Sequence, residues 1–244
     1  MKFDSDIKSY KSATKLFLIH FAGGSCYSFP FLKFLTAKFE VIPLELPGRG
    51  RRVKEELVND FDQAADDILK QIMAVLKDEI FVIYGHSMGA LLALTVSKLL
   101  ENVNKQAQCV IVSGTPGPRS HAPKTNRYQL PDEAFFNEVK KLGGLPDELF
   151  DEPDLMAFYL PILKADFEVA EQNDLVFHPK VTCPIFAMMG DEEECVNEIH
   201  NWENYTSAYF NQKTFPGGHF FFNNSPEDIA QAIIEFHDSL EKSA

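Results

Sequence analysis

The sequence predicts an α/β protein built on a mostly parallel central sheet flanked by helices. Short apolar runs alternate along the chain with stretches of helical periodicity, which is the pattern of βαβ units. Most of these runs are apolar throughout, as expected for strands that helices cover on both faces. With 244 residues, of which 45% are hydrophobic, the chain can bury one sizeable core, so we expect a single domain over residues 1–244.

Five apolar runs predict strands, and a shorter sixth run indicates one more. In chain order, the expected strands are Leu16–Ile19, Val41–Leu44, Phe81–Tyr84, Cys109–Val112, Ile185–Met189 and, from the shorter run, Lys213–Phe215. A helix is expected before the third strand, because apolar residues recur at helical spacing from Phe61 onward, after Asp60 and Gln63 as a capping box. At the other end of the chain, Ser225 as the cap and Pro226 in the first turn predict a last helix.

The stretch from about residue 116 to 179 breaks this alternation. It contains no predicted strand, and short helical segments alternate there with glycine and proline among apolar and aromatic residues. Because the stretch lies between the fourth and fifth strands, it would cover the carboxyl edge of the sheet, where α/β proteins bind their ligands. We therefore predict a helical lid, with ordinary core packing as the alternative explanation of its aromatic residues.

The composition argues against several classes of protein. A net charge of −13 and a sequence pI near 5.0 oppose binding to nucleic acid, which depends on clustered Lys and Arg. No apolar run reaches membrane-spanning length and the first residues are partly acidic, so we expect no membrane span, no secretory signal and a cytoplasmic location. The four cysteines lack the spacing of metal ligands and are expected to be buried free thiols.

A nucleophile is predicted at Ser87. The segment Gly85-His86-Ser87-Met88-Gly89 follows the third strand and precedes a helical stretch, as in the nucleophile elbow of α/β hydrolases. The flanking glycines allow unusual dihedrals and a close backbone approach, so that the turn can raise the hydroxyl above the sheet. Lipases, esterases and peptidases share this elbow, so other residues must define the reaction.

A serine of this kind needs a base and an acid from later loops. Of the seven histidines, His219 follows the last expected strand in a glycine-rich loop, which makes it the predicted base. His86 is expected to pack beside the serine and orient the elbow, and His20 to brace its own loop. The residues alone leave the acid open, because residues 191–194 after the fifth strand offer four carboxylates.

The intermediate of acyl transfer carries an oxyanion, which two backbone N–H groups normally bind. One donor is expected from Met88, the residue after the nucleophile, and the other from the loop 20–24 after the first strand. Two glycines let the backbone of that loop approach the reacting atom, although a plain glycine-rich turn would have the same composition.

Four motifs in order give the chain a close resemblance to a known family. They are His20-Phe21-Ala22-Gly23-Gly24, Leu46-Pro47-Gly48-Arg49-Gly50, Gly85-His86-Ser87-Met88-Gly89 and Pro216-Gly217-Gly218-His219-Phe220. With them the chain resembles the type II thioesterases associated with nonribosomal peptide and polyketide synthases. The resemblance extends to the insertion through Leu130-Pro131-Asp132-Glu133, Leu142-Gly143-Gly144-Leu145-Pro146 and Leu160-Pro161. It implies an α/β-hydrolase fold, a triad containing Ser87 and His219, and an oxyanion hole formed by Ala22 and Met88.

The resemblance narrows the acid to two residues. Where the family commonly has an aspartate three residues after a glycine, this chain has Glu193, and Asp191 fills an earlier acidic place. The sequence frame favours Glu193, whereas residue type favours Asp191. The segment Ser113-Gly114-Thr115-Pro116 after the fourth strand carries no acid, although chain-terminating thioesterases often keep theirs there, which favours a separate editing enzyme.

The resemblance also implies a reaction and a partner. The reaction is hydrolysis of acyl or aminoacyl thioesters on the phosphopantetheine arm of acyl or peptidyl carrier proteins, with acyl-CoA as a further substrate. No metal or cofactor is implied, because the substrate protein carries the phosphopantetheine, and a monomer is expected. The alternatives are a general acyl-CoA or small-ester serine hydrolase and a catalytically inactive module that docks carrier proteins.

Charge sets a condition on that partner. Carrier proteins are usually acidic, so an enzyme of net charge −13 should present a basic patch to them. The two candidate patches are Arg49, Arg51, Arg52 and Lys54, and Arg119, Lys124 and Arg127. A solvated basic loop is the alternative explanation of the first cluster.

Overall fold

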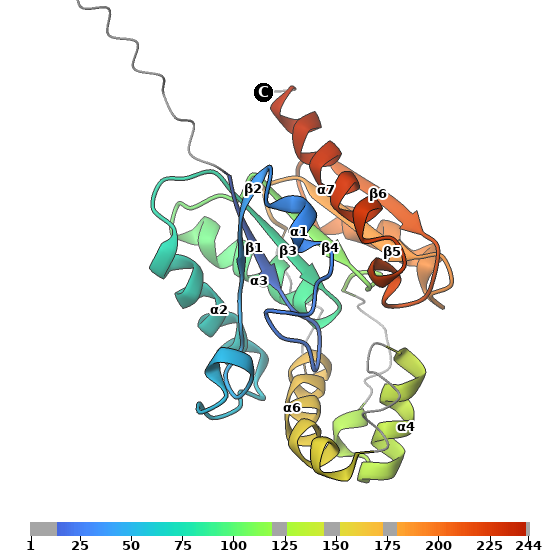
Figure 1. Ribbon diagram of the computed structural model, residues 1–244. Coiled ribbons are helices and arrows are strands. Elements are labelled where there is room, and N and C mark those ends of the chain that lie inside the picture. Colours follow the sequence, from blue (N-terminus) through green and yellow to red (C-terminus); the bar gives the residue numbers. More distant parts are fainter. Residues whose placement is uncertain (1–13, 119–125, 144–151, 173–179, 243–244) are drawn as a thin grey trace, which may run out of the picture.

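The computed structural model describes residues 14–118, 126–143, 152–172 and 180–242. Its centre is a six-stranded sheet with the order β2-β1-β3-β4-β5-β6, in which every neighbouring pair of strands is parallel (Figure 1). The strands are β1 (Thr14–Ile19), β2 (Phe39–Pro43), β3 (Phe81–His86), β4 (Cys109–Ser113), β5 (Ile185–Gly190) and β6 (Phe210–Phe215). The predicted parallel sheet is therefore confirmed.

Three strands begin earlier than the sequence indicated: the inner strand β1, which begins at Thr14 rather than Leu16, and the two edge strands. β6 begins at Phe210 rather than Lys213, and its residues 211–214 are exposed. β2 begins at Phe39 rather than Val41, with Glu40 exposed. An edge strand pairs on one side only and can leave residues in solvent, so it needs no continuous apolar run. A search for apolar runs therefore stops at the polar residues near the starts of these strands, Glu40 in β2 and residues 211–212 in β6.

Alternate side chains of each strand supply the two faces of the sheet, as the twofold periodicity of a strand requires. In β1, Phe17 and Ile19 belong to the core shared with α2 (Phe61–Val75) and α3 (Met88–Asn102). Leu16 and Leu18 belong to the core shared with α1 (Leu32–Leu35) and α7 (Pro226–Glu241). Helices therefore cover both faces (Figure 1). Outside the insertion, the described residues also form the 3₁₀ helices η1 (Gly50–Arg52), η4 (Val196–Tyr205) and η5 (Phe221–Asn223).

Both predicted helix starts are present, with one difference in the capping. The Asp60 side chain caps α2 by accepting a hydrogen bond from the N–H of Gln63 at 2.8 Å. Ser225 precedes α7, but its hydroxyl makes no capping hydrogen bond, and its carbonyl accepts from the N–H of Asp228 at 3.1 Å and of Ile229 at 3.2 Å. The ψ of 66° at Ser225 lies outside the extended region usual for a capping residue, which accounts for the difference.

Two expectations from composition can be compared with the structure. Cys26, Cys109 and Cys183 are buried free thiols as predicted, whereas Cys195 is partly exposed. The prediction was wrong for Cys195 because it follows an acidic turn at the surface rather than lying in an apolar run. Among the helices of the described ranges, none combines the length and the apolar character needed to cross a membrane.

The described part of the predicted insertion is helical. It contains η2 (Arg127–Gln129), α4 (Asp132–Leu142) and α6 (Pro153–Glu171), while the predicted residues 119–125, 144–151 and 173–179 lie outside the described residues. Phe135 and Val139 of α4 pack against Leu163 and Phe167 of α6. This helix pair stands beyond the carboxyl ends of the strands, and α6 also contacts α2 and α3 (Figure 1).

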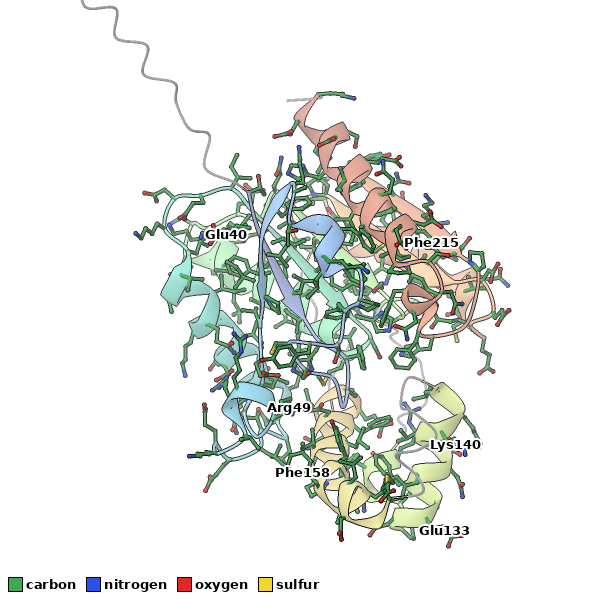
Figure 2. The ribbon with its side chains drawn as sticks, in the orientation of Figure 1. Glu40, Arg49, Glu133, Lys140, Phe158 and Phe215 are labelled. Atoms are coloured by element: carbon green, nitrogen blue, oxygen red, sulfur yellow. The ribbon has the colours of Figure 1, made fainter. Side chains whose placement is uncertain are left out.

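The helix α6 has two dissimilar halves. Pro161 lies inside it. Before this proline, Leu155 and Phe158 are 44% and 50% exposed, whereas Leu163 and Asp166 after it are buried. Figure 2 shows Arg49 near the buried end of α6 and Phe158 on the half farther from the sheet. The half after Pro161 is therefore the part that joins this helix to the sheet layer.

Candidate active site

Ser87 occupies a strained turn between β3 and α3. Its backbone has φ 56° and ψ −117°, a conformation that residues other than glycine rarely adopt, and its N–H donates to the carbonyl oxygen of Ser113 at 2.8 Å. A Cβ on Gly85 would lie 2.0 Å from the carbonyl oxygen of Gly89, and one on Gly89 would lie 2.4 Å from that of Ile19. Neither glycine has a positive φ. The two glycines thus permit close approach, while the unusual dihedrals belong to the serine.

His219 forms a hydrogen bond with Glu193, the acid that the sequence frame favoured. Nδ1 of His219 lies 2.9 Å from Oε2 of Glu193, and the other oxygen, Oε1, accepts from the N–H of Gly190 at 2.9 Å. The side chains of His219 and Glu193 are 16% and 10% exposed. Both oxygens of this carboxylate are therefore held by donors at a partly buried position.

Asp191, the alternative acid, binds a different group. Its Oδ1 accepts from the N–H of Gly217 at 2.9 Å, so it supports the loop that carries His219 rather than the imidazole itself. A Cβ on Gly190 would lie 2.2 Å from the carbonyl oxygen of Gly217, which shows how closely the loops after β5 and β6 approach. The remaining acids of this turn, Glu192 and Glu194, are exposed, as solvated charges usually are.

His86 packs beside His219 without exposure to solvent. The two rings have centroids 4.9 Å apart, and Nδ1 of His86 lies 2.8 Å from Oγ of Ser113. That hydroxyl is also 2.7 Å from the hydroxyl of Tyr84. Burial, together with the neighbouring His219, holds the pKa of His86 well below its usual range. His86 is therefore a neutral packing partner, and Gly114 leaves room for it, since a Cβ there would lie 2.2 Å from the ring.

The loop after β1 meets the start of α3. A Cβ on Gly89 would lie 2.4 Å from the carbonyl oxygen of Ile19 and 2.6 Å from that of His20, so the first turn of α3, which begins at Met88, packs closely against this loop. The first N–H groups of a helix have no partner within the helix and can bind a ligand. Ala22 lies in the same loop, in a turn closed by a hydrogen bond from Gly24 to Phe21 at 2.9 Å.

An aromatic contact of Phe21 and the imidazole of His20 connect the loop after β1 to neighbouring loops. The rings of Phe21 and Phe220 meet edge to face with centroids 4.8 Å apart, so the residue after His219 touches the loop after β1. Nδ1 of His20 lies 2.9 Å from the carbonyl oxygen of Phe21, and its Nε2 lies 3.3 Å from the N–H of Leu46. His20 thus bridges the loops after β1 and β2, as a bracing residue should.

The first predicted basic patch is largely engaged in ion pairs. Arg49 is buried against Asp166, and Arg52 binds Asp67 at 2.6 Å and Glu55 at 2.6 Å. The prediction that these four residues form one exposed cluster was wrong, because Arg49 is buried and acidic side chains pair with both Arg49 and Arg52. Of the second patch, residues 119 and 124 lie outside the described residues, and Arg127 pairs with Glu171 at 2.5 Å.

Four loops, which follow β1, β3, β5 and β6, therefore converge at the carboxyl ends of these strands. They bring together the serine elbow, the pair His219 and Glu193, and the loop around Ala22. The arrangement can support attack of a serine on an acyl group. Sequence reasoning missed Ser113 and Asp166, because a serine at a strand end and an aspartate within a helix carry no local signal of a role.

Comparison with known proteins agrees with this geometry. Residues 14–238 match the family model of the thioesterase domain. The chain belongs to the thioesterase family. Thioesterase PikA5 of Streptomyces venezuelae is 30% identical over 228 residues, which are 92% of this thioesterase and 81% of PikA5. The gramicidin S biosynthesis protein GrsT of Aneurinibacillus migulanus is 29% identical over 91% of this thioesterase and 88% of GrsT.

Solved structures of thioesterases from biosynthetic pathways share the fold. ClbQ, from the colibactin pathway of combined nonribosomal peptide and polyketide synthesis, has a TM-score of 0.88 and 27% identity over 96% of this thioesterase and 100% of ClbQ. BorB, the type II thioesterase of the borrelidin cluster, has a TM-score of 0.83 and 29% identity over 93% of each chain. The predicted α/β-hydrolase fold and the resemblance to type II thioesterases are thereby confirmed.

Proposed function

We propose that this thioesterase is a type II editing enzyme, which hydrolyses acyl and aminoacyl thioesters on the phosphopantetheine arm of carrier proteins in nonribosomal peptide or polyketide biosynthesis. The observation that carries the proposal is the hydrogen bond between His219 and Glu193, with the His219 ring packed against His86, the residue before the elbow serine. It supports a base of fixed tautomer, which acyl transfer to serine requires. Relatives named for gramicidin S biosynthesis and for the colibactin pathway support the class of substrate.

The mechanism has two half-reactions. In the first, Nε2 of His219 takes the proton of Ser87 as Oγ attacks the thioester carbonyl carbon; the C–S bond then breaks, and His219 protonates the departing thiolate. In the second, His219 takes a proton from water as the water oxygen attacks the acyl-serine carbonyl carbon; the C–Oγ bond then breaks, and His219 returns the proton to Oγ of Ser87, which releases the acyl group as its acid. Glu193 keeps the proton on Nδ1 and stabilises the imidazolium that forms in each half.

The oxyanion of both tetrahedral intermediates is bound by the backbone N–H groups of Ala22 and Met88. The position of Met88 at the start of α3 supports this assignment, because helix N-termini favour negative charge. The close approach of Gly89 to the carbonyl oxygens of Ile19 and His20 supports it too, since it brings the loop that carries Ala22 against the first turn of α3.

The helices α4 and α6 act as the lid of a single domain over residues 1–244. Their place beside the catalytic loops suits a cover that admits the pantetheine arm and limits the access of water during turnover (Figure 1). The enzyme works as a monomer in the cytoplasm and needs no cofactor, because the mechanism uses only side chains and backbone groups of the chain. Exposed Arg51 and Lys54 are the remaining basic residues of the first patch for contact with an acidic carrier protein.

The test compares wild type and Ser87→Ala on three substrates: acetyl-loaded carrier protein, acetyl-CoA and nitrophenyl acetate. We expect wild type to show its highest kcat/KM on the carrier protein, and Ser87→Ala to lose about 10⁴-fold or more on all three. Retained activity in Ser87→Ala would overturn the mechanism. Equal rates on all three substrates would instead support a general acyl-CoA or ester hydrolase, and failure of a fluorophosphonate probe to label Ser87 would support a docking module.

A further inference from the structure

A buried carboxylate of α6 joins two loops of the active site. Asp166 is fully buried and pairs with Arg49, which is 3% exposed. Nη2 of Arg49 donates to Oδ1 at 2.7 Å, and Nη1 donates to Oδ2. Oδ2 also accepts from the N–H of Gly23 at 2.7 Å. Arg49 follows β2 and Gly23 follows β1, so a single side chain of the lid helix holds the loops at the ends of two neighbouring strands.

The hydrogen bond from Gly23 to Asp166 orients the peptide group between Ala22 and Gly23. In the turn from Phe21 to Gly24, Gly23 has φ 77°, which is the conformation that the third residue of a type II turn requires. The central peptide of such a turn can rotate to the type I arrangement, which would turn its N–H away from Asp166 and present the carbonyl of Ala22 instead. A carboxylate repels a carbonyl oxygen, so Asp166 selects one orientation of the Ala22–Gly23 peptide.

The same face of α6 holds the turn from a second point. Leu163 lies three residues before Asp166 and therefore on the same side of the helix. A Cβ on Gly23 would lie 2.5 Å from Cδ2 of Leu163, so the helix is packed directly against this glycine. Packing and hydrogen bonding thus act together on one residue of the turn.

We infer that Asp166 is a positioning residue of the oxyanion hole: by anchoring Gly23, the residue after Ala22, it fixes the position of the turn that carries the Ala22 N–H beside the reacting carbonyl. The inference rests on the proposed function only in taking the Ala22 N–H as an oxyanion donor. A purely structural role for the ion pair is the competing explanation. Apolar residues of similar volume often replace a buried ion pair without loss of stability, which separates the two explanations experimentally.

The experiment compares three variants with wild type. Asp166→Asn removes the charge and leaves Arg49 buried without its partner, so it is also expected to be less stable. The double variant Arg49→Met/Asp166→Leu removes both charges and the acceptor for Gly23, which preserves folding while freeing the turn. Asp67→Asn is the matched control, because it weakens the Arg52 ion pair in the same loop region, and Asp67 makes no bond to the turn.

Each variant is assayed for kcat and KM on nitrophenyl acetate, for binding of an alkyl boronic acid that forms a tetrahedral adduct with a nucleophilic serine, and for urea unfolding. We expect the double variant to stay folded with kcat lowered about 10- to 100-fold and KM little changed. Boronic acid affinity should fall by a similar factor, because it reports the same tetrahedral geometry. The control should stay within about threefold of wild type.

Wild-type kcat and boronic acid affinity in the folded double variant would overturn the inference, whatever its stability. An equal loss in the Asp67→Asn control would overturn it as well, since the effect would then belong to the loop in general. The ester assay does not depend on the natural substrate. A wild-type enzyme that hydrolyses the ester but no carrier-bound thioester would therefore refute the proposed function while leaving the role of Asp166 tested.

Discussion

The two hydrogen bonds of Glu193 predict what happens when it becomes glutamine. In the native protein Oε1 accepts from the N–H of Gly190, and Oε2 is bonded to Nδ1 of His219, both at 2.9 Å. A glutamine has one acceptor oxygen and one NH₂ group. Because the N–H of Gly190 can only donate, the amide oxygen stays on Gly190 and the NH₂ group faces His219. Nδ1 must then accept, and the imidazole proton moves to Nε2.

That tautomer removes the base, since Nε2 can no longer take the proton of Ser87. The corresponding change in serine proteases lowers kcat by about 10⁴-fold with the geometry intact, which is about 5 kcal/mol at 1.36 kcal/mol per tenfold. Asp191→Asn differs, because the amide oxygen of asparagine can still accept from the N–H of Gly217. We expect it to change kcat by less than about threefold.

The assay is single-turnover release of acetate from acetyl-loaded carrier protein, with circular dichroism to establish that each variant is folded. Glu194→Gln is the matched control, because Glu194 is exposed in the same turn. A large loss of turnover in Asp191→Asn, with Glu193→Gln close to wild type, would refute the assignment of the acid. Equal losses in both would mean that the loop as a whole, rather than the imidazole tautomer, sets the rate.

Three further predictions concern stability. Gly89→Ala places a Cβ 2.4 Å from the carbonyl oxygen of Ile19, and should lower the free energy of unfolding in urea by about 1 to 3 kcal/mol; an unchanged midpoint would contradict the close approach. Ser113→Ala leaves buried polar partners unsatisfied and should cost about 1 to 3 kcal/mol in the same assay, an expectation that a wild-type midpoint would refute. Burial lowers the pKa of His86 and of His20 from 6.5, so the unfolded chain binds more protons below that pH. Stability present above pH 6.5 should therefore fall on acidification toward the folded pKa values, by up to about 1.4 kcal/mol per pH unit for each histidine, and a flat profile between pH 7 and 5 would contradict it.

The sequence identified features whose physical cause is local. A strand covered on both faces is apolar along most of its length, so each strand was found from its apolar run, while the polar residues at or near the starts of β1, β2 and β6 were not included. Ser87 and His219 were found because a strand must precede each of their loops. The resemblance left Glu193 and Asp191 as candidates for the acid of the triad. The choice between them depended on which carboxylate lies within hydrogen-bond distance of His219. Glu193 reaches the imidazole while its other oxygen returns to Gly190, a geometry that the spacing of acids along the chain does not specify.

Arg49 shows why the rest could not be predicted. An arginine next to other basic residues normally lies in solvent, and that rule gave a patch for acidic carrier proteins. Its partner Asp166 is 117 residues away in sequence, in a helix whose packing depends on the whole fold. Because Arg49 is buried, its charge adds little to the attraction of an acidic partner at the surface. Through Asp166 it instead connects the loops that follow β1 and β2. A basic residue that the motif would assign to partner binding is thus better explained by the geometry of the catalytic loops, and attraction of a carrier protein must depend on residues that remain exposed, such as Arg51 and Lys54.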